Sequence, residues 1–133
     1  MQPVDQPFPG LEGCRVIVTG GTKGIGAGLA REFLRSGARV LVCARNEPAV
    51  MPAAGGRTAQ FTRADVRDPE QARHLVATAV DLFGGVDLVI SNAGGSPPAP
   101  AATASPRFHT KIIELNLIAP LHVAQAANQV IAG

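Results

Sequence analysis

Residues 16–26 of this 133-residue chain read Val16-Ile17-Val18-Thr19-Gly20-Gly21-Thr22-Lys23-Gly24-Ile25-Gly26. A short apolar run, a glycine-rich turn and the start of a helical pattern follow one another in this stretch. The amide N–H groups of such a turn and the positive end of the helix dipole converge on one point, where an anion is stabilised. Because glycine lacks a Cβ, the backbone here can approach a pyrophosphate closely. This order predicts a bound nucleotide cofactor, although a glycine cluster after a strand also serves as simple turn chemistry.

Strand and helix patterns alternate on the C-terminal side of this turn. We expect strands at residues 15–19, 39–43, 59–64 and 86–91, and helices at residues 24–36, 69–83 and 107–130. Such alternation is typical of parallel strands joined by right-handed helical crossovers. The sequence therefore predicts an α/β fold, a doubly wound parallel sheet with strand order 3-2-1-4. The switch point between strands one and four brings the glycine turn beside the loop Asn92-Ala93-Gly94.

The chain reads as one domain preceded by a short lead-in. Residues 1–13 contain three prolines and little periodicity, so we expect them to be extended, with the domain covering residues 14–133. Proline and glycine recur at residues 46–58, and any helix there must be short. The expected apolar stripe of the first helix consists of Ile25, Leu29, Phe33 and Leu34.

Composition excludes several classes of function. The net charge is +2 and aromatic residues make up 4% of the chain, so neither a basic stripe nor an aromatic platform predicts nucleic-acid binding. No apolar run approaches the roughly 20 residues of a membrane span. The three histidines lack the spacing of metal ligands. Cys14 and Cys43 are expected near opposite ends of neighbouring strands, so we do not expect them to pair, and this favours a reducing, cytoplasmic setting.

The end of the second strand predicts which dinucleotide binds. A carboxylate at this position bonds the ribose 2′-hydroxyl of NAD, whereas an arginine accommodates the 2′-phosphate of NADP. The chain has Arg45 here and no carboxylate before Glu47, and Lys23 of the glycine turn adds a second cation. This favours NADP (NADPH) over NAD, with a solvated surface arginine as the alternative interpretation.

Two further positions have a functional and a structural interpretation. Asp65 and Val66 follow the third strand, where the carboxylate can accept from the adenine amino group while Val66 covers the ring; otherwise Asp65 is a loop aspartate. Asn116 lies four residues before Pro120, which has no N–H, so the Asn116 carbonyl loses its usual helical partner. We expect a bend there that either holds an ordered water or is a proline kink without function.

These residues together resemble the short-chain dehydrogenase/reductase family, from about Leu11 to the end of the chain. The resemblance is carried by Thr19 to Gly26, Asp65-Val66, Asn92-Ala93-Gly94 and Asn116. It implies a Rossmann fold that binds NAD(P), with the turn on the pyrophosphate and Asn92-Ala93-Gly94 beside the adenosine ribose. It implies hydride transfer between nicotinamide and a small-molecule carbonyl or alcohol, a water relay at Asn116, and a homo-oligomer (dimer or tetramer). The cofactor-binding residues it implies are Gly20, Thr22, Lys23, Gly24, Ile25, Gly26, Arg45, Asp65, Val66, Asn92, Ala93 and Gly94.

The chain departs from the family in its catalytic residues. Family members use a serine and a Tyr-x-x-x-Lys segment that follow the part matched here, and this chain contains no tyrosine. We therefore interpret it as the cofactor-binding half of an NADP-dependent oxidoreductase and expect it to be inactive alone. The alternatives are a catalytically silent nucleotide-binding module that acts through partners, and a relative of the sugar-nucleotide epimerases.

Overall fold

The computed structural model describes residues 9–94 and 102–131. Most of the expected lead-in and residues 95–101 of the expected loop before the last helix lie outside the described residues. The strands are β1 (Arg15–Thr19), β2 (Arg39–Ala44), β3 (Ala53–Ala54), β4 (Arg57–Thr58), β5 (Gln60–Arg63) and β6 (Leu88–Ser91). The helices are α1 (Gly24–Arg35), α2 (Pro69–Phe83), α3 (Pro106–Ile113), the π-helix η1 (Glu114–Ile118) and α4 (Ala119–Ile131).

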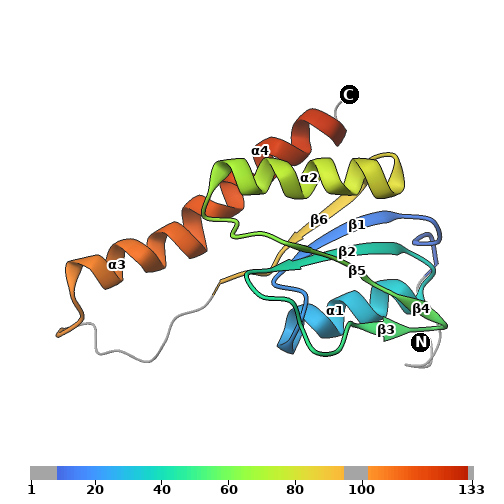
Figure 1. Ribbon diagram of the computed structural model, residues 1–133, viewed down its shortest axis with the longest axis horizontal. Coiled ribbons are helices and arrows are strands. Elements are labelled where there is room, and N and C mark those ends of the chain that lie inside the picture. The colour runs from blue at the N-terminus through green and yellow to red at the C-terminus, as the bar shows by residue number, and fades with distance from the viewer. Residues whose placement is uncertain (1–8, 95–101, 132–133) are drawn as a thin grey trace.

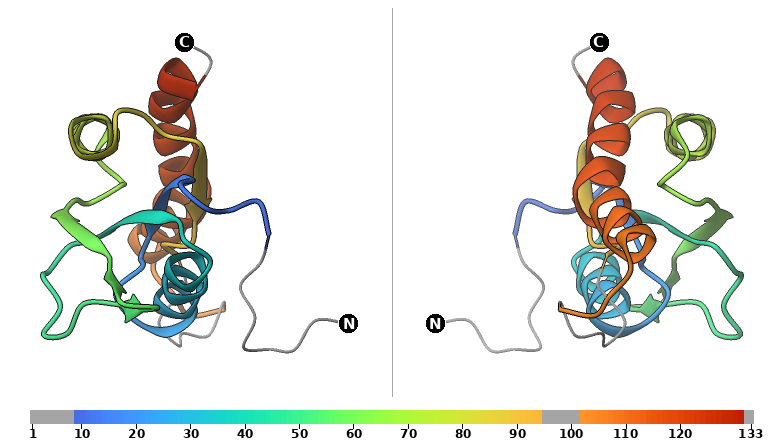
Figure 2. Two further views of the ribbon diagram at one scale, coloured as in Figure 1. Left: turned by 90° about the vertical axis from the view of Figure 1, so that its right-hand side faces the viewer. Right: turned by 90° about the vertical axis from the view of Figure 1, so that its left-hand side faces the viewer.

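Four parallel strands form a sheet in the order β5-β2-β1-β6, which confirms the expected order 3-2-1-4. Helix α1 covers one face of this sheet, and α2 and α4 cover the other (Figures 1 and 2). Helix α3 extends away from the sheet beyond its carboxyl end (Figure 1). The fold is therefore the predicted doubly wound α/β arrangement, and β6 pairs only with β1 among the described strands.

Alternating side chains of the central strands supply the core on both faces. Ile17, Leu41 and Cys43 are buried against α2 and α4, in one cluster with Leu75 and Val123. Val16, Val18, Val40 and Val42 are buried on the opposite face, in the cluster that contains Ala30 and Leu34 of α1. Because both faces are covered, these strands read as continuous apolar runs rather than alternating ones.

Capping residues set the boundaries of α2, whereas one expectation about the buried face of α1 was wrong. The Asp68 carboxylate accepts from the Glu70 amide at the start of α2, and Gly84 ends the helix in the left-handed conformation with φ of 83°. The expectation that Ile25 belongs to the apolar stripe of α1 was wrong, since its side chain is 78% exposed. The buried residues of α1 are instead three small ones, Gly26, Ala27 and Ala30, together with Leu34.

Residues 46–58 contain a feature that we did not expect. Strands β3 and β4 pair in an antiparallel hairpin across Gly55 and Gly56, whose φ angles are 61° and 75°. Consecutive positive φ angles are typical of the tight turn that matches strand twist, and glycine adopts them without strain. Cys14 and Cys43 are free and lie toward opposite ends of β1 and β2, as expected.

We expected a bend in the last helix next to Pro120, and the structure has a π-helical turn there. Between α3 and α4 the chain forms the π-helix η1, in which the Ala119 amide donates to the Glu114 carbonyl five residues earlier. A wide turn next to Pro120 accommodates a residue that has no N–H to donate. Asn116 lies within this wide turn.

An ion pair ties the start of β1 to the loop before β6. Arg15 donates from its Nε and Nη2 atoms to the two carboxylate oxygens of Asp87, each at 2.9 Å, and its backbone amide donates to Oδ2 at 2.9 Å. The hydrogen bonds from Arg15 lower the pKa of the Asp87 carboxyl from 3.8 to about 2. The charged carboxylate therefore stabilises the folded state.

We expect this pair to make the fold sensitive to acid. Because the pKa of Asp87 is lower in the folded than in the unfolded chain, its contribution is fully present above about pH 4 and is lost as pH falls toward 2. Since the Asp87 side chain is 41% exposed, Asp87→Asn should lower the free energy of unfolding at pH 7 by only about 1 kcal/mol. Urea unfolding at several pH values should show the two proteins converging below pH 4. A constant difference down to pH 2, or the same convergence in the control Asp81→Asn, would contradict this assignment.

Candidate functional site

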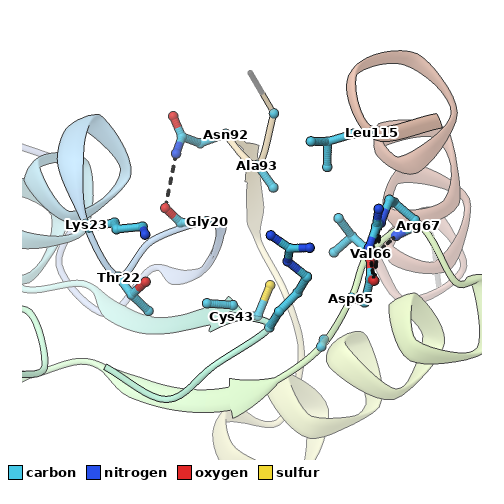
Figure 3. A pocket seen from close by; sticks show the side chains of 14 residues that line it. Gly20, Thr22, Lys23, Cys43, Asp65, Val66, Arg67, Asn92, Ala93 and Leu115 are labelled. Carbon is cyan, nitrogen blue, oxygen red and sulfur yellow. Dashed lines mark hydrogen bonds and ion pairs between the residues drawn. The ribbon is translucent and has the colours of Figure 1, made fainter. Parts of the chain in front are cut away.

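A cavity of about 330 Å³ lies at the carboxyl ends of the four parallel strands. It is bounded by the glycine turn after β1, the end of β2, the loop after β5, the loop after β6 and the wide turn η1 (Figure 3). The residues that line it are Gly20, Thr22, Lys23, Cys43, Ala44, Arg45, Ala64, Asp65, Val66, Arg67, Asn92, Ala93, Gly94 and Leu115. The switch point of an open α/β sheet is where such folds bind ligands, and the volume is that of a small-molecule site.

The glycine turn is held in a conformation that leaves open space next to its backbone. Gly20 and Gly24 have φ angles of 64° and 60°, which favour glycine. A Cβ built on Gly24 would meet no atom within 4 Å. The first turn of α1 contains no acidic residue that would offset the positive end of its dipole. This cradle suits the close approach of a phosphate group.

The same turn packs tightly where it faces the protein. A Cβ on Gly26 would overlap the carbonyl oxygen of Gly20, and one on Gly21 would lie 2.5 Å from Cγ1 of Val42. Gly26 therefore lets α1 start directly against the turn, and it does not itself line the cavity. Neither Gly24 nor the exposed Ile25 lines this cavity, so the structure brings together only part of the expected glycine set.

Hydrogen bonds join the turn after β1 to the loop after β6. The buried Thr19 hydroxyl accepts from the amides of Asn92 at 3.0 Å and Ala93 at 3.1 Å. The Asn92 side-chain amide donates to the Gly20 carbonyl at 3.2 Å (Figure 3). The two loops that sequence reasoning placed side by side are therefore one hydrogen-bonded unit.

Two cations line the cavity at the end of β2 and in the glycine turn. Arg45 is exposed, and its side chain makes no hydrogen bond or ion pair with any residue in the described part of the chain; the same holds for Lys23. No carboxylate lies among the lining residues from β2. Both cations are available to an anionic ligand.

Among the described residues, Asp65 in the loop after β5 is the one acidic side chain that lines the cavity, and it has a neighbour that we did not predict. Arg67 donates from Nε to Asp65 Oδ1 at 2.9 Å and from Nη2 to Oδ2 at 2.6 Å, as the dashed lines in Figure 3 show. The hydrogen bonds from Arg67 lower the pKa of the Asp65 carboxyl, and the charge of Arg45 contributes to the same shift. Asp65 is therefore ionised and paired within the protein.

Four more lining residues escaped sequence reasoning: Cys43, Ala44, Ala64 and Leu115. Burial raises the pKa of the Cys43 thiol to about 11, so this side chain is an uncharged part of the wall. Its place at the carboxyl end of β2, two residues before Arg45, could have located it. No pattern in the sequence points Leu115 at the cavity.

Asn116 lies beside the cavity rather than in its wall. Its side-chain amide donates to the Ile112 carbonyl at 3.0 Å. A Cβ on Gly94 would lie 2.6 Å from Asn116 Oδ1, so the absence of a side chain at Gly94 allows this approach. The wide turn and the loop after β6 are therefore in direct contact at Asn116.

No group of three or more histidine, cysteine or acidic residues could hold a metal ion in residues 9–94 and 102–131. Over the same residues, no helix combines the length and apolar character needed to cross a membrane.

Comparison with known proteins gives a consistent result. The family model described as short chain dehydrogenase matches residues 15–132. The L-fucose dehydrogenase of Oryctolagus cuniculus is 40% identical over 111 residues, which cover 77% of this chain and 37% of that protein.

Solved structures match over a larger share of the chain. The NADH-dependent reductase A1-R′ complexed with NAD has 28% identity and a TM-score of 0.80, covering 90% of this chain and 53% of that one. A short chain dehydrogenase from Burkholderia cenocepacia J2315 in complex with NADP has 30% identity and a TM-score of 0.82. The match covers 91% of this chain and 52% of that one. The chain thus spans about half the length of these structures and less of the curated dehydrogenase.

Proposed function

Because the chain belongs to the short-chain dehydrogenase family of oxidoreductases, we propose that it forms the cofactor-binding half of an NADP-dependent enzyme. The intact enzyme would interconvert a small-molecule carbonyl compound and an alcohol. When bound, NADP supplies or accepts the hydride. The domain proposed for this task is residues 14–133, with residues 1–13 as a lead-in.

One observation carries the choice of NADP. Lys23 and Arg45 border the cavity at the place where the adenosine ribose is expected, and neither side chain has a partner in the described residues. A guanidinium forms two parallel hydrogen bonds to phosphate oxygens, and a carboxylate that would prefer the 2′-hydroxyl of NAD is missing from the end of β2. Solved relatives bind NAD in one case and NADP in another, so the choice depends on these side chains.

The remaining residues have proposed tasks that follow from their positions. The amides of the turn and the start of α1 bind the pyrophosphate, with Gly20, Thr22, Gly24, Ile25 and Gly26 forming that segment. Val66 covers one side of the adenine and Asp65 accepts from its amino group. Asn92, Ala93 and Gly94 lie beside the ribose, and Asn116 orders a water for proton transfer.

The chain alone should bind NADPH without reducing a carbonyl compound. Its 133 residues include no tyrosine, so they lack the Tyr-x-x-x-Lys segment that family members use as general acid and base. Titration of the purified chain should quench or enhance NADPH fluorescence, while absorbance at 340 nm stays constant with any carbonyl compound added. Turnover by the purified chain would contradict the view that the missing groups are needed.

A nucleotide-binding module without turnover is the second candidate, favoured by the same lack of tyrosine. Both candidates predict binding, so the gene separates them. A reading frame that continues past codon 133 into a Tyr-x-x-x-Lys segment supports the enzyme, and a stop codon there supports the silent module.

The proposal extends to assembly and compartment. Ile113, Leu117 and Leu121 are 52%, 60% and 59% exposed and recur every fourth residue along η1 and its flanks. Such a stripe supports a homo-oligomer, a dimer or a tetramer, built on this helix. Two unpaired cysteines support a cytoplasmic location.

A further inference from the structure

Arg67 and Asp65 form an ion pair in the wall of the cavity, next to the cation proposed for the 2′-phosphate. The guanidinium approaches the carboxylate with two N–H groups, at 2.9 and 2.6 Å, and the Arg67 backbone amide adds a bond of 3.1 Å to Oδ1. Both side chains are partly exposed, at 29% and 27%. This geometry fixes the direction in which the Asp65 carboxylate points (Figure 3).

Arg45 is the second cation that acts on the same carboxylate. Its charge stabilises ionised Asp65, yet the two side chains make no hydrogen bond and no ion pair. Asp65 therefore has two cations within electrostatic range and bonds to only one of them. With Asp65 paired to Arg67, the Arg45 guanidinium has no carboxylate partner within residues 9–94 and 102–131.

From this arrangement we propose that Arg67 is a specificity-determining residue for NADP, which acts by holding and neutralising Asp65 so that Arg45 stays available for the 2′-phosphate. The inference rests on the proposed function, because it concerns the same cofactor site. Arg67 lies outside the glycine turn and the end of β2, the two segments whose side chains support the choice of NADP. Arg67 acts through Asp65 and is a positioning residue, not a direct ligand of the phosphate.

Charge balance gives the direction of the effect. Lys23, Arg45 and Arg67 contribute three positive charges to the cavity wall, and Asp65 contributes one negative charge. Without Arg67, the Asp65 carboxylate has Arg45 as its remaining close cation. It would pair with Arg45 and repel a phosphate at the same place, which weakens the binding of NADPH more than that of NADH.

The test compares the ratio of the NADH to the NADPH dissociation constant among variants of this chain, measured by fluorescence titration. Arg67→Gln should lower this ratio about fivefold. Arg67→Lys keeps the charge and should stay within twofold of wild type. Arg73→Gln removes another arginine that pairs with a carboxylate, Glu70 on α2, and should leave the ratio unchanged.

Removing Asp65 as well separates the indirect role from direct contact. The double variant Asp65→Asn with Arg67→Gln should restore the wild-type ratio, because the negative charge that competes for Arg45 is gone. If the ratio of the double variant is as low as that of Arg67→Gln alone, the proposal is overturned, because Arg67 would then contact the phosphate itself. A wild-type ratio in Arg67→Gln would also overturn it.

The single variant Asp65→Asn keeps the proposal testable even where Arg67→Gln does not fold. It should raise the ratio about fivefold, and an unchanged or lower ratio contradicts the role of Asp65. Failure of the proposed function is a different result, in which the folded wild-type chain binds neither dinucleotide. A wild type that prefers NADPH, with variants that do not change this preference, rejects the role of Arg67 alone.

Discussion

Replacing Gly26 by alanine is expected to lower the free energy of unfolding by about 3 kcal/mol and to abolish dinucleotide binding at ordinary concentrations. The new Cβ would overlap the Gly20 carbonyl oxygen and press on the side-chain amide of Asn92, which donates to that carbonyl. The carbonyl belongs to the backbone and the Asn92 amide is hydrogen-bonded to it, so neither group can rotate away. The turn would have to move away from α1, and its amide groups would no longer point toward the same phosphate position.

Gly28 provides a matched control two residues along the same helix. A Cβ on Gly28 would meet no atom within 4 Å, so alanine there gains helix propensity without a clash. Gly28→Ala should therefore raise the free energy of unfolding by about 1 kcal/mol. Urea unfolding followed by circular dichroism measures both variants. Equal effects of the two substitutions would show that the packing of Gly26 against the turn does not matter.

The sequence predicted the sheet because its signals were local and redundant. Asp68 and Pro69 mark the start of α2, and Gly84 marks its end, each through a backbone preference that needs no tertiary context. The strand order then follows from right-handed crossovers. The hairpin β3–β4 was missed because its strands have two residues each, too short for any periodicity, although Gly55-Gly56 is a turn signal.

The candidate site was predictable where it depends on topology. The switch point alone places Gly20 beside Asn92 and Ala93, and the structure joins them through hydrogen bonds of Thr19 and Asn92. Ile25 was misplaced for a physical reason. The spacing of large apolar residues cannot identify the buried face of a helix when glycine and alanine make up most of that face.

The side-chain contacts of Arg67 and Leu115 could not be predicted from the sequence. Arg67 lies two residues from Asp65, but only the loop conformation brings its guanidinium back onto that carboxylate. Leu115 reaches the cavity from the wide turn η1, and a proline signals that a helix is disturbed without specifying a π-turn. These contacts depend on the backbone conformation of the loop and of the π-turn, which composition and spacing do not encode.

The second large effect is expected for Arg45→Asp, which should weaken NADPH binding about 100-fold and change NADH binding less than threefold. The variant removes charge-assisted hydrogen bonds to the 2′-phosphate and places a carboxylate where NAD-binding proteins have one. Asp65 is already paired with Arg67, so the new carboxylate has Lys23 as its remaining cation among the lining residues. Titrating both dinucleotides into the same preparation measures the two dissociation constants directly.

Arg57→Asp is the control for charge alone. Arg57 lies on β4 and is exposed outside the cavity, and its replacement changes the net charge by the same amount. Long-range attraction of the more negative dinucleotide would be reduced equally by both variants and would fade with added salt. A contact between Arg45 and the 2′-phosphate predicts instead that Arg57→Asp is silent and that most of the effect of Arg45→Asp persists at 0.15 M salt, roughly the physiological ionic strength. Equal losses in the two variants, or equal affinities of the wild type for NADH and NADPH, would remove Arg45 from the site and with it the argument for NADP.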